Sequence, residues 1–373
     1  MRVAVWTPEA RGVTPGQRFR IEQWEPFLRD EGFDLTYFPF LDTDTATLLK
    51  DGGHALAKAV RVTRLLLRRL RLAAVTAGFD LVYIFRETAL LGPAVAERVL
   101  RRRGLPYVFD FDDSVWIRYR SPTNAHWSYL RCPGKTATTC RLSHHVMAGN
   151  DTLAEYARRF ASRVSVVPTT IDTDLYVPPP AKREVGMVIG WSGSYSTGPY
   201  LDLLRVVLPR LARRFRFRFV TIGAREFRVE GVNVEVRPWR RETELVDLGQ
   251  FDIGVMPLPD AVWERGKCGL KALQYMALSI PAVVSPVGVN RSIIAHGQNG
   301  LLADTEEDWE RALGQLLGDE SLRRRLGQAG RLTVERDFSA RAHAPRVAGI
   351  LRSAVPPRPP AGPGVGDRPS DQR

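Results

Sequence analysis

Cysteine is scarce in this sequence, and long apolar runs are absent. The 373 residues include three cysteines, an odd number that forms no disulfide framework and suits a reducing compartment. Cys132 and Cys140 are too far apart for a CxxC metal knuckle, so we interpret them as plain thiols. The longest apolar runs, such as IPAVV, fall far short of the roughly 20 residues that cross a bilayer. The N-terminal MRVAVWTPEA lacks the layout of a signal peptide, so we expect a cytoplasmic protein.

Acidic residues are outnumbered by basic ones. The chain has 54 Lys and Arg against 41 Asp and Glu, which gives a formal net charge of +13. Such a charge calls for a polyanionic neighbour, and nucleic acid, an anionic lipid surface and a phosphorylated substrate all qualify. The sequence contains no helix-turn-helix, zinc-finger or RNP-like motif, so we expect no specific nucleic-acid partner.

Part of the positive charge is concentrated in residues 55–74, ALAKAVRVTRLLLRRLRLAA. On a helical wheel one apolar stripe is formed by Leu56, Val60, Leu67 and Leu70. Basic residues cover most of the rest: Lys58, Arg61, Arg64, Arg68, Arg69 and Arg71. Leu65 and Leu72 lie within that basic face, where a merely solvated face would seldom place leucine. Two interpretations stay open: the helix lies on an anionic membrane surface, or it packs on the core with a solvated basic back.

Short β-branched runs alternate with helical patterns along the chain, which is typical of parallel α/β folding. The strands expected in the first half are RVAVW, DLTYFPF, DLVYIF, PYVFDF, HVMAG and VSVVP. A Pro-rich charged break follows, and the alternation restarts with GMVIGW, RFRFVTIG, VNVEV, FDIGVMPL and PAVVSP. The sequence therefore predicts two doubly wound α/β domains. We place the first at 1–176, a linker at 177–186, the second domain at 187–335, a helix packing back on the first domain at 336–354 and a disordered tail at 355–373.

The segment ERGKCGLKALQYMA, residues 264–277, gathers positive charge at a helix start. Its apolar spacing predicts a helix that begins near Gly269. Lys267 and Lys271 stand at the end where a helix already carries about half a positive charge. We therefore predict an anion site there, with Gln274 reaching beyond the anion towards sugar hydroxyls. The alternative is that Glu264 and solvent neutralise the two lysines.

Two further turns of the second domain leave a strand and enter a helix. After Trp191 comes a run of small residues, with a helix predicted to start near Thr197. Ser192, Gly193 and Ser194 would let free amides and hydroxyls approach an anion. The amides of Gly288, Val289 and Asn290 would face the same crevice. Ordinary strand-to-helix connections are the alternative for both turns.

The first domain has two turns of interest. A Gly/Pro loop that contains Gly16 ends in Arg18 and Arg20, which would hold an acidic acceptor or be solvated. The segment VFDFDDSVW places Asp110, Asp112 and Asp113 at a strand end. These acids would bind a metal, act as a base or hydrogen-bond sugar hydroxyls, and simple helix capping explains at most one of them. We expect Arg86 and Glu87 nearby as ion-pair partners.

Over nearly its whole length the chain resembles the retaining glycosyltransferases of GT-B fold, in the large family four group (glycosyl transferases group 1). The resemblance is strongest from FDIGVMPLPD through GKCGLKALQYMALSIPAVVSPVGVN to HGQNGLLA, and it extends to GNDTLAEYA and VVPTTIDTDLY. It implies two Rossmann-like domains facing across a cleft. It also implies a nucleotide-diphosphate sugar donor, a cell-envelope glycan or lipid-linked acceptor, and no metal or other cofactor.

The resemblance also implies roles for individual residues. Lys267 would bind and stabilise the leaving diphosphate, and Asp112 would orient the acceptor. The family carries two glutamates eight apart, and their positions fall on Gly266 and Gln274. Of these two residues, Gln274 would bind the donor ribose or sugar. The family's phosphate-binding arginine is replaced by WSGSYS. The acceptor would lie near Arg18, Arg20 and the three aspartates.

Other functions compete with transfer. A nucleotide-sugar epimerase shares the fold and needs no acceptor, but the sequence offers no convincing set of histidine and acids for it. A homologue that binds the donor without turnover is favoured by the replaced glutamates. A basic nucleic-acid-binding protein is suggested by the net charge alone.

Overall fold

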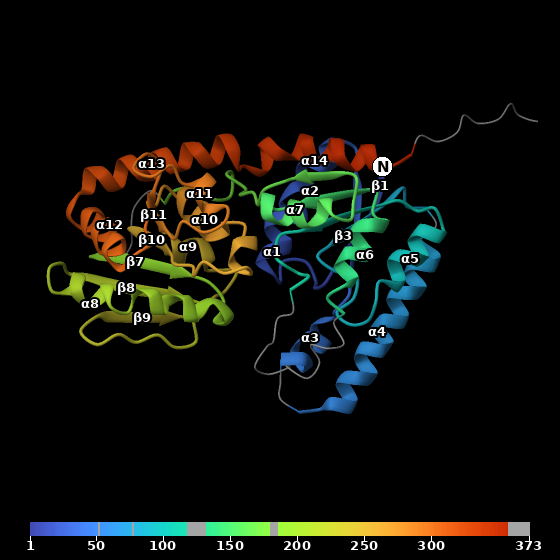
Figure 1. Cartoon of the computed structure of the whole chain (residues 1–373), viewed down its shortest axis with the longest axis horizontal. Helices are drawn as coiled ribbons and strands as arrows, with labels where there is room; N and C mark the ends of the chain where they lie inside the picture. The colour runs from blue at the N-terminus through green and yellow to red at the C-terminus, as the bar shows by residue number, and fades with distance from the viewer. Residues whose placement is uncertain (51–52, 77, 118–131, 180–185, 357–373) are drawn as a thin grey trace, which may run out of the picture.

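The computed structural model of the protein describes residues 1–50, 53–76, 78–117, 132–179 and 186–356. Two six-stranded parallel sheets organise the chain, one in each half, with helices on both faces (Figure 1). The predicted pair of doubly wound α/β domains is confirmed. Most of the predicted linker and nearly all of the predicted disordered tail lie outside the described residues.

The N-terminal sheet has the strand order β2-β1-β3-β4-β5-β6. Each of its predicted strands is present, and the four inner strands are buried because they are mostly apolar on both faces, whereas the edge strands β2 and β6 are partly exposed. The elements are β1 (Arg2–Thr7), α1 (Pro15–Gln17), a π-helical turn (Arg18–Glu22), α2 (Gln23–Asp30), β2 (Asp34–Pro39), α3 (Thr43–Lys50), α4 (Ala55–Val75), β3 (Leu81–Phe85), α5 (Val95–Arg102), β4 (Tyr107–Phe111), α6 (Lys135–Leu142), β5 (His145–Ala148), α7 (Asp151–Arg158) and β6 (Val164–Val166).

The C-terminal sheet has the order β12-β11-β10-β7-β8-β9. Its predicted strands are also present, and the short edge strand β12 is an addition that two residues could not signal in the sequence. The elements are β7 (Met187–Ser192), a 3₁₀ helix (Tyr195–Leu204), α8 (Val207–Ala212), β8 (Phe217–Ile222), β9 (Asn233–Arg237), α9 (Glu244–Leu248), β10 (Ile253–Met256), a 3₁₀ turn (Glu264–Gly266), α10 (Leu270–Ala277), β11 (Ala282–Val284), α11 (Asn290–Ile293), β12 (Leu301–Leu302), α12 (Glu306–Gly318), α13 (Glu320–Asp337) and α14 (Ala340–Ala354).

Both sheets reverse their winding direction next to their first strand. In the N-terminal sheet β1 lies between β2 and β3, and in the C-terminal sheet β7 lies between β8 and β10. Ligands of doubly wound sheets bind in the crevice outside the carboxyl ends of the strands at such a reversal. The loops that follow β1 and β3 in one domain, and β7 and β10 in the other, are therefore the places to look for a site.

The chain crosses between the two domains twice, and the two crossings are hydrogen-bonded to each other. Helix α13 lies along the C-terminal domain, and α14 continues over the N-terminal domain, where it packs on α2 (Figure 1). Just before α14, Ser339 pairs with Ile171, which follows the N-terminal sheet. The Ile171 amide donates to the Phe338 carbonyl at 2.8 Å, and the Ala340 amide donates to the Ile171 carbonyl at 2.8 Å.

Helix α4, which carries the basic segment, buries a different face from the one that the helical wheel suggested. Leu65 is 6% exposed, and Leu72 packs against the core, so their placement in an outward face is wrong. The stripe residues Leu56, Val60 and Leu67 are instead 80%, 42% and 51% exposed. Because this helix is apolar on two sides, periodicity could not decide which side faces the sheet.

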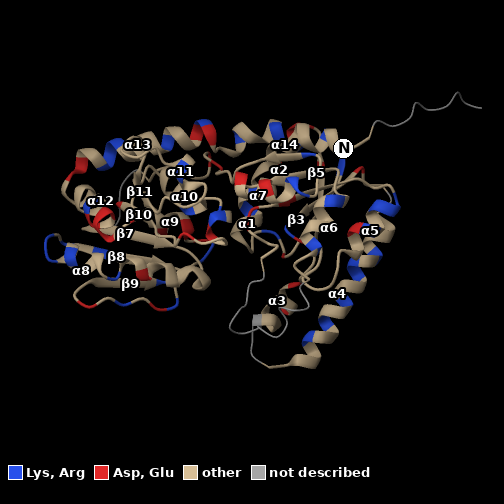
Figure 2. Ribbon diagram, in the orientation of Figure 1, with Lys and Arg blue, Asp and Glu red and all other residues tan. Residues whose placement is uncertain are grey.

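The outward face of α4 therefore combines apolar residues with arginine. Figure 2 shows basic residues in blue along the whole of this helix. Within the described residues, none of the helices has the length and apolarity that crossing a membrane requires.

Candidate functional site

The predicted lysine-rich helix start is present at the carboxyl edge of the C-terminal sheet. Helix α10 begins at Leu270, and Gly269 precedes it with φ 69°, a left-handed conformation that favours glycine. A Cβ on Gly269 would also come within 2.3 Å of the Ile293 side chain, so the glycine lets the turn pack closely. This turn fixes Lys267 just outside the helix and places Lys271 in its first turn.

The anion that neutralises Lys267 comes from the other domain. Its Nζ lies 2.9 Å from Oδ2 of Asp113, which follows β4. The Lys267 backbone carbonyl accepts a hydrogen bond of 3.0 Å from the side-chain amide (Nδ2) of Asn150, which is the N-cap residue of α7. Glu264, the neutralising group considered from the sequence, instead accepts from the Tyr200 hydroxyl. Lys267 therefore ties the carboxyl edges of the two sheets together.

Lys271 carries a second charge for which the described residues provide no salt bridge. Its Nζ lies 4.6 Å from the centre of the Trp191 ring, at the end of β7. Burial, aided by repulsion from Lys267, lowers the pKa of Lys271 to about 7. A cation over an aromatic face is attracted to it, but the ring supplies no negative charge. The amine of Lys271 therefore has no carboxylate partner among the described residues, and it lies at the point where the C-terminal sheet reverses its winding direction.

The small-residue turn after β7 does not offer the free amides that its sequence predicts. The amide of Ser192 donates to the Tyr275 hydroxyl at 2.9 Å, and that of Gly193 donates to the Ile222 carbonyl at 2.9 Å. The amide of Ser194 is bound by Thr197. The helix also begins earlier than predicted, because Ser194 is its cap and Thr197 completes the capping box. The three predicted amides are therefore already bound, which leaves the hydroxyl groups of Ser192 and Ser194 as the groups of these residues that could contact a nucleotide sugar.

The turn after β11 presents two of the three backbone amides that were predicted to be available for an anion. Gly288 has φ 54°, and a Cβ there would come within 2.7 Å of the Arg265 carbonyl, so this turn lies directly against the lysine segment. Within the described chain, the amides of Gly288 and Val289 have no protein acceptor. The amide of Asn290, in contrast, donates to the Val287 carbonyl at 3.2 Å and is not available.

Gln274 is part of a buried network between the domains. It is 3% exposed, and its amide nitrogen lies 3.1 Å from the Tyr176 hydroxyl and 3.3 Å from Oε1 of Glu244. Glu244 also accepts from Trp239 at 3.1 Å and from Arg18 at 2.5 Å. The amide that was predicted to reach a donor ribose is thus already bound by protein groups.

Gly266, which takes the place of the family's first glutamate, lies at the domain contact. A Cβ on Gly266 would come within 2.0 Å of the Ser114 hydroxyl oxygen in the N-terminal domain. The neighbouring Cys268 thiol contacts the Asp112 carbonyl at 3.3 Å. The absence of a side chain at Gly266 therefore permits close approach of the two domains.

The three aspartates after β4 do not form one cluster, because each has its own cationic partner. Asp110 pairs with Arg20, Asp112 with Arg86 and Asp113 with Lys267. Among the residues that the structure describes, no group of three His, Cys, Asp or Glu side chains is arranged to hold a metal ion.

Asp112 lies where an acceptor-side carboxylate was predicted. One of its oxygens is 2.5 Å from Nε of Arg86, which follows β3. Burial acts to raise the pKa of Asp112, but the charge and hydrogen bond of Arg86 outweigh it, so the pKa lies below its usual value. Gly16, in the loop after β1, is pressed against this pair, since a Cβ there would come within 2.9 Å of an Asp112 oxygen. Gly16, Arg86 and Asp112 thus meet where the N-terminal sheet reverses.

The structure places Arg20 and Asp110, which were predicted to bind the acceptor, inside the core. Both side chains are 0% exposed, and two guanidinium nitrogens of Arg20 bind the two carboxylate oxygens of Asp110. Tyr83 binds the same carboxylate, and Arg20 lies over the Trp24 ring. Burial outweighs Arg20 and raises the pKa of Asp110. This pair is part of the core and has no surface to offer an acceptor.

Arg18 reaches the other domain and is only 14% exposed. Its guanidinium pairs with Glu244 and lies over the Trp239 ring, 5.8 Å from the ring centre. Its predicted contact with an acceptor would require this pair to open.

Three residues of this region were missed in the sequence. Asn150 caps α7 and binds the lysine segment, and its place before a helical pattern is a readable capping signal. Ser114 contacts Gly266, and Glu244 collects the interdomain hydrogen bonds. Neither has a local sequence signal, because each is defined by a partner in the other domain.

Residues 186–319 match the family model described as Glycosyl transferases group 1. A relative, D-inositol 3-phosphate glycosyltransferase from Corynebacterium aurimucosum, is 29% identical in an alignment 235 residues long, and the match covers 54% of this chain and 54% of that protein. The chain thus spans about half the length of this curated relative in the match. The predicted resemblance to group 1 glycosyltransferases is confirmed for residues 186–319, and the chain is similar in sequence to a glycosyltransferase.

Several solved structures share the fold. Sucrose-phosphate synthase from Thermosynechococcus elongatus has a TM-score of 0.70 at 14% identity, covering 94% of this chain and 98% of the other. Anabaena HepE, in complex with UDP-glucose, has a TM-score of 0.64 at 15% identity, covering 95% of this chain and all of the other (100%). The lipopolysaccharide outer core galactosyltransferase WaaB has a TM-score of 0.56 at 14% identity, covering 95% and 99%. The chain therefore has the predicted GT-B fold.

Proposed function

We propose that the protein is a retaining glycosyltransferase that moves a sugar from a nucleotide-diphosphate donor to a glycan or lipid-linked acceptor. One observation carries the proposal: Lys267 and Lys271 stand where the C-terminal sheet reverses, directly opposite Asp112 and Asp113 of the N-terminal domain. The family match over residues 186–319 supports the same activity.

The donor diphosphate would bind between the two lysines. Lys271 lacks a salt bridge among the described residues, and the amides of Gly288 and Val289 add hydrogen-bond donors beside the lysine segment. HepE, a GT-B neighbour, is known in complex with UDP and with UDP-glucose, which supports a uridine nucleotide as the first candidate. The nearby hydroxyls of Ser192 and Ser194 are the remaining donors of the turn after β7.

Binding of the donor would exchange the partners of Lys267. A diphosphate carries more negative charge than a carboxylate, so Lys267 would leave Asp113 for the phosphate. Asp113 would then be free to accept a hydrogen bond from an acceptor hydroxyl. Asp112 would stay fixed by Arg86 and keep the acceptor side rigid. The Lys267–Asp113 pair thus joins the groups proposed to bind the two substrates.

The transfer itself would need little acid-base help from the protein. The acceptor oxygen forms a bond to the anomeric carbon, the bond from that carbon to the phosphate oxygen breaks, and the hydroxyl proton passes to the leaving phosphate. Lys267 and Lys271 stabilise the negative charge that develops on the diphosphate. Two parts of this proposal rest on the resemblance. The lysines neutralise the diphosphate without a metal ion, and the anomeric carbon keeps its configuration.

The proposal is tested by calorimetric titration of UDP, GDP, ADP and dTDP, with magnesium and with EDTA. We expect one diphosphate to bind with the same affinity in both conditions, and the matching nucleotide sugars then become the donors to assay. Binding of a nucleotide sugar without transfer to any acceptor or water would favour an inactive homologue. No binding at millimolar concentration would contradict the donor site.

We also propose that α4 rests on an anionic membrane surface on the cytoplasmic side. Its exposed residues Leu56, Val60 and Leu67 would enter the headgroup region, and the arginines between them would meet lipid phosphates. This peripheral contact would bring the N-terminal domain to a lipid-linked acceptor.

A further inference from the structure

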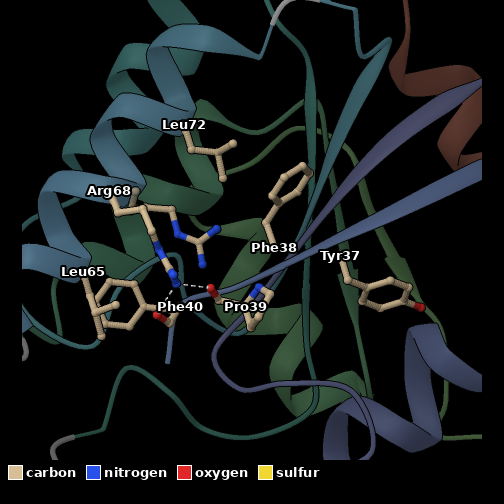
Figure 3. A pocket seen from close by; sticks show the side chains of 8 residues that line it. Tyr37, Phe38, Pro39, Phe40, Leu65, Arg68 and Leu72 are labelled. Atoms are coloured by element: carbon tan, nitrogen blue, oxygen red, sulfur yellow. Dashed lines mark hydrogen bonds between the residues drawn. The ribbon is translucent and has the colours of Figure 1, made fainter. Parts of the chain in front are cut away.

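A cavity of about 210 Å³ lies beneath α4, at the carboxyl ends of β1 and β2. The cavity is lined by Phe38 in β2, by Phe40 just after this strand, and by Leu65 and Leu72 of α4 (Figure 3). Its walls are therefore largely apolar. Because Phe38 and Leu72 are half-buried, the cavity opens to the surface beside the outward face of α4.

One charged group in the wall of this cavity lacks a counter-ion. Arg69 is 3% exposed, and its Nη1 has no hydrogen-bond partner among the described residues. Its Nη2 makes a long contact of 3.4 Å to the Thr7 carbonyl, and its guanidinium lies over the Trp6 ring, 4.8 Å from the ring centre. An isolated buried charge is strongly unfavourable unless it is paired.

The charged groups around Arg69 are consistent with its lack of a salt bridge among the described residues. Burial, together with repulsion from Arg68, lowers the pKa of Arg69 to about 9, and the attraction of Glu97 compensates only in part. Arg68, at the edge of the cavity, already donates to the Pro39 and Phe40 carbonyls at 2.9 and 3.0 Å (Figure 3). Arg69 is therefore the group in this wall that still needs an anion.

The cavity lies on the same edge of the sheet as the acceptor side of the proposed active site. The sheet order places β1 and β3 between β2 and β4, and Asp112 follows β4. Neighbouring strands lie about 5 Å apart, so the cavity and Asp112 are separated by roughly 10–15 Å. The loop after β1 spans this distance, because it starts at Thr7, beside Arg69, and brings Gly16 against Asp112.

We propose that this cavity binds an amphiphilic anion: its alkyl or prenyl chain fills the apolar space, and its phosphate pairs with Arg69. Both halves of the ligand have a counterpart in the wall, since an apolar chain alone would leave the guanidinium unpaired and a free anion would leave the space empty. The inference deepens the proposed function, on which it rests for its biological use, because such a ligand at this edge is the lipid part of an acceptor.

The test is calorimetric titration of the full chain with decyl phosphate below its critical micelle concentration, beside inorganic phosphate and decanol. We expect decyl phosphate to bind at least tenfold more tightly than either fragment. Arg69→Met should weaken decyl phosphate binding at least tenfold, and the matched change Arg213→Met, on an exposed arginine of the C-terminal domain, should alter it less than twofold. Leu72→Trp, which fills the cavity and leaves Arg69 in place, should also weaken binding at least tenfold.

Several outcomes would overturn the inference. The inference fails if decyl phosphate does not bind at millimolar concentration, or if Arg69→Met binds it as tightly as the parent protein does. It also fails if inorganic phosphate or decanol binds as tightly as decyl phosphate. Titration of UDP on the same samples separates this inference from the proposed function. If UDP binds and decyl phosphate does not, the cavity proposal alone is rejected. If decyl phosphate binds and UDP does not, the donor-site proposal alone is rejected.

Discussion

Lys267 of the C-terminal domain and Asp113 of the N-terminal domain form an ion pair across the cleft, with Nζ 2.9 Å from Oδ2. The side chains are 24% and 14% exposed, so the pair is mostly shielded from water. Each partner belongs to a different substrate site in the proposed function. The pair therefore links donor binding to the release of a carboxylate on the acceptor side.

Removing the lysine tests the donor site. Lys267→Ala should weaken binding of the nucleotide diphosphate by more than tenfold, because a charge-assisted contact to phosphate contributes roughly 1.5–3 kcal/mol. Calorimetric titration measures the change. Arg265→Ala, which removes an exposed neighbour that pairs with Asp260, is the matched control and should leave the affinity unchanged. Equal affinity of Lys267→Ala and the parent would reject the site.

Removing the aspartate tests the exchange of partners. Asp113→Asn should tighten diphosphate binding about two- to fivefold, since Lys267 no longer has to leave an ion pair that contributes roughly 0.5–1 kcal/mol. The same variant should lose activity in a transfer assay, because it also removes the carboxylate proposed for the acceptor. Weaker diphosphate binding by Asp113→Asn would show that the carboxylate holds the lysine in place for the donor.

Donor binding should depend on pH through Lys271. The pKa of its amine is about 7 in the free protein, and a bound diphosphate raises it. Above pH 7 the free amine is largely neutral, so binding takes up a proton, and affinity should fall with rising pH by at most tenfold per unit. Titrations from pH 6.5 to about 9 measure this slope. Lys271→Arg keeps its charge and should abolish the decline; an equal slope in that variant would assign the proton to another group.

The Arg20–Asp110 pair should behave as part of the core. Arg20→Met leaves Asp110 buried without its cation, which should lower the free energy of unfolding by about 3–5 kcal/mol. Urea denaturation measures the loss. Arg324→Met, on a side chain that is 75% exposed, removes a surface pair with Glu320 and should change the free energy of unfolding by less than about 0.5 kcal/mol. A small effect of Arg20→Met would reopen an acceptor role for this arginine.

Membrane association should depend on the outward face of α4. Replacing Arg61, Arg64 and Arg71 by Glu should lower the affinity for vesicles containing an anionic phospholipid more than a hundredfold, because each basic residue near such a surface contributes about 1 kcal/mol. Vesicle sedimentation measures the bound fraction. A control with the same change in net charge reverses three exposed arginines of the C-terminal domain: Arg213, Arg214 and Arg216. Equal loss in both variants would mean that only net charge matters.

The fold was largely predictable because its strands are continuous apolar runs between helical patterns, and parallel sheets require such runs. Lys267 and Lys271 were identified by an equally local argument, since two cations at a helix start need an anion. The sequence could not show that Asp113 provides the anion for Lys267. That partner is distant along the chain, and its approach depends on how the two domains meet.

The acceptor side was predicted less well, for a reason seen at Arg18 and Arg20. The two residues are two positions apart in a π-helical turn, where Arg20 has φ −121° and ψ −112°. This distortion directs Arg20 into the core and leaves Arg18 at the domain contact. A regular helical or loop pattern carries no information on such a local turn. The buried face of α4 was misassigned for a related reason, since both of its sides are rich in leucine.

The bridge between Ile171 and Ser339 would act as a pivot in any rotation of one domain against the other, because the outgoing and returning segments of the chain are hydrogen-bonded there. Displacement then increases with distance from the pivot. A rotation of a few degrees would therefore move atoms far from the bridge by a larger distance. The contacts that resist this rotation include the ion pairs of Lys267 with Asp113 and of Arg18 with Glu244. Their opening would govern the rate of substrate entry.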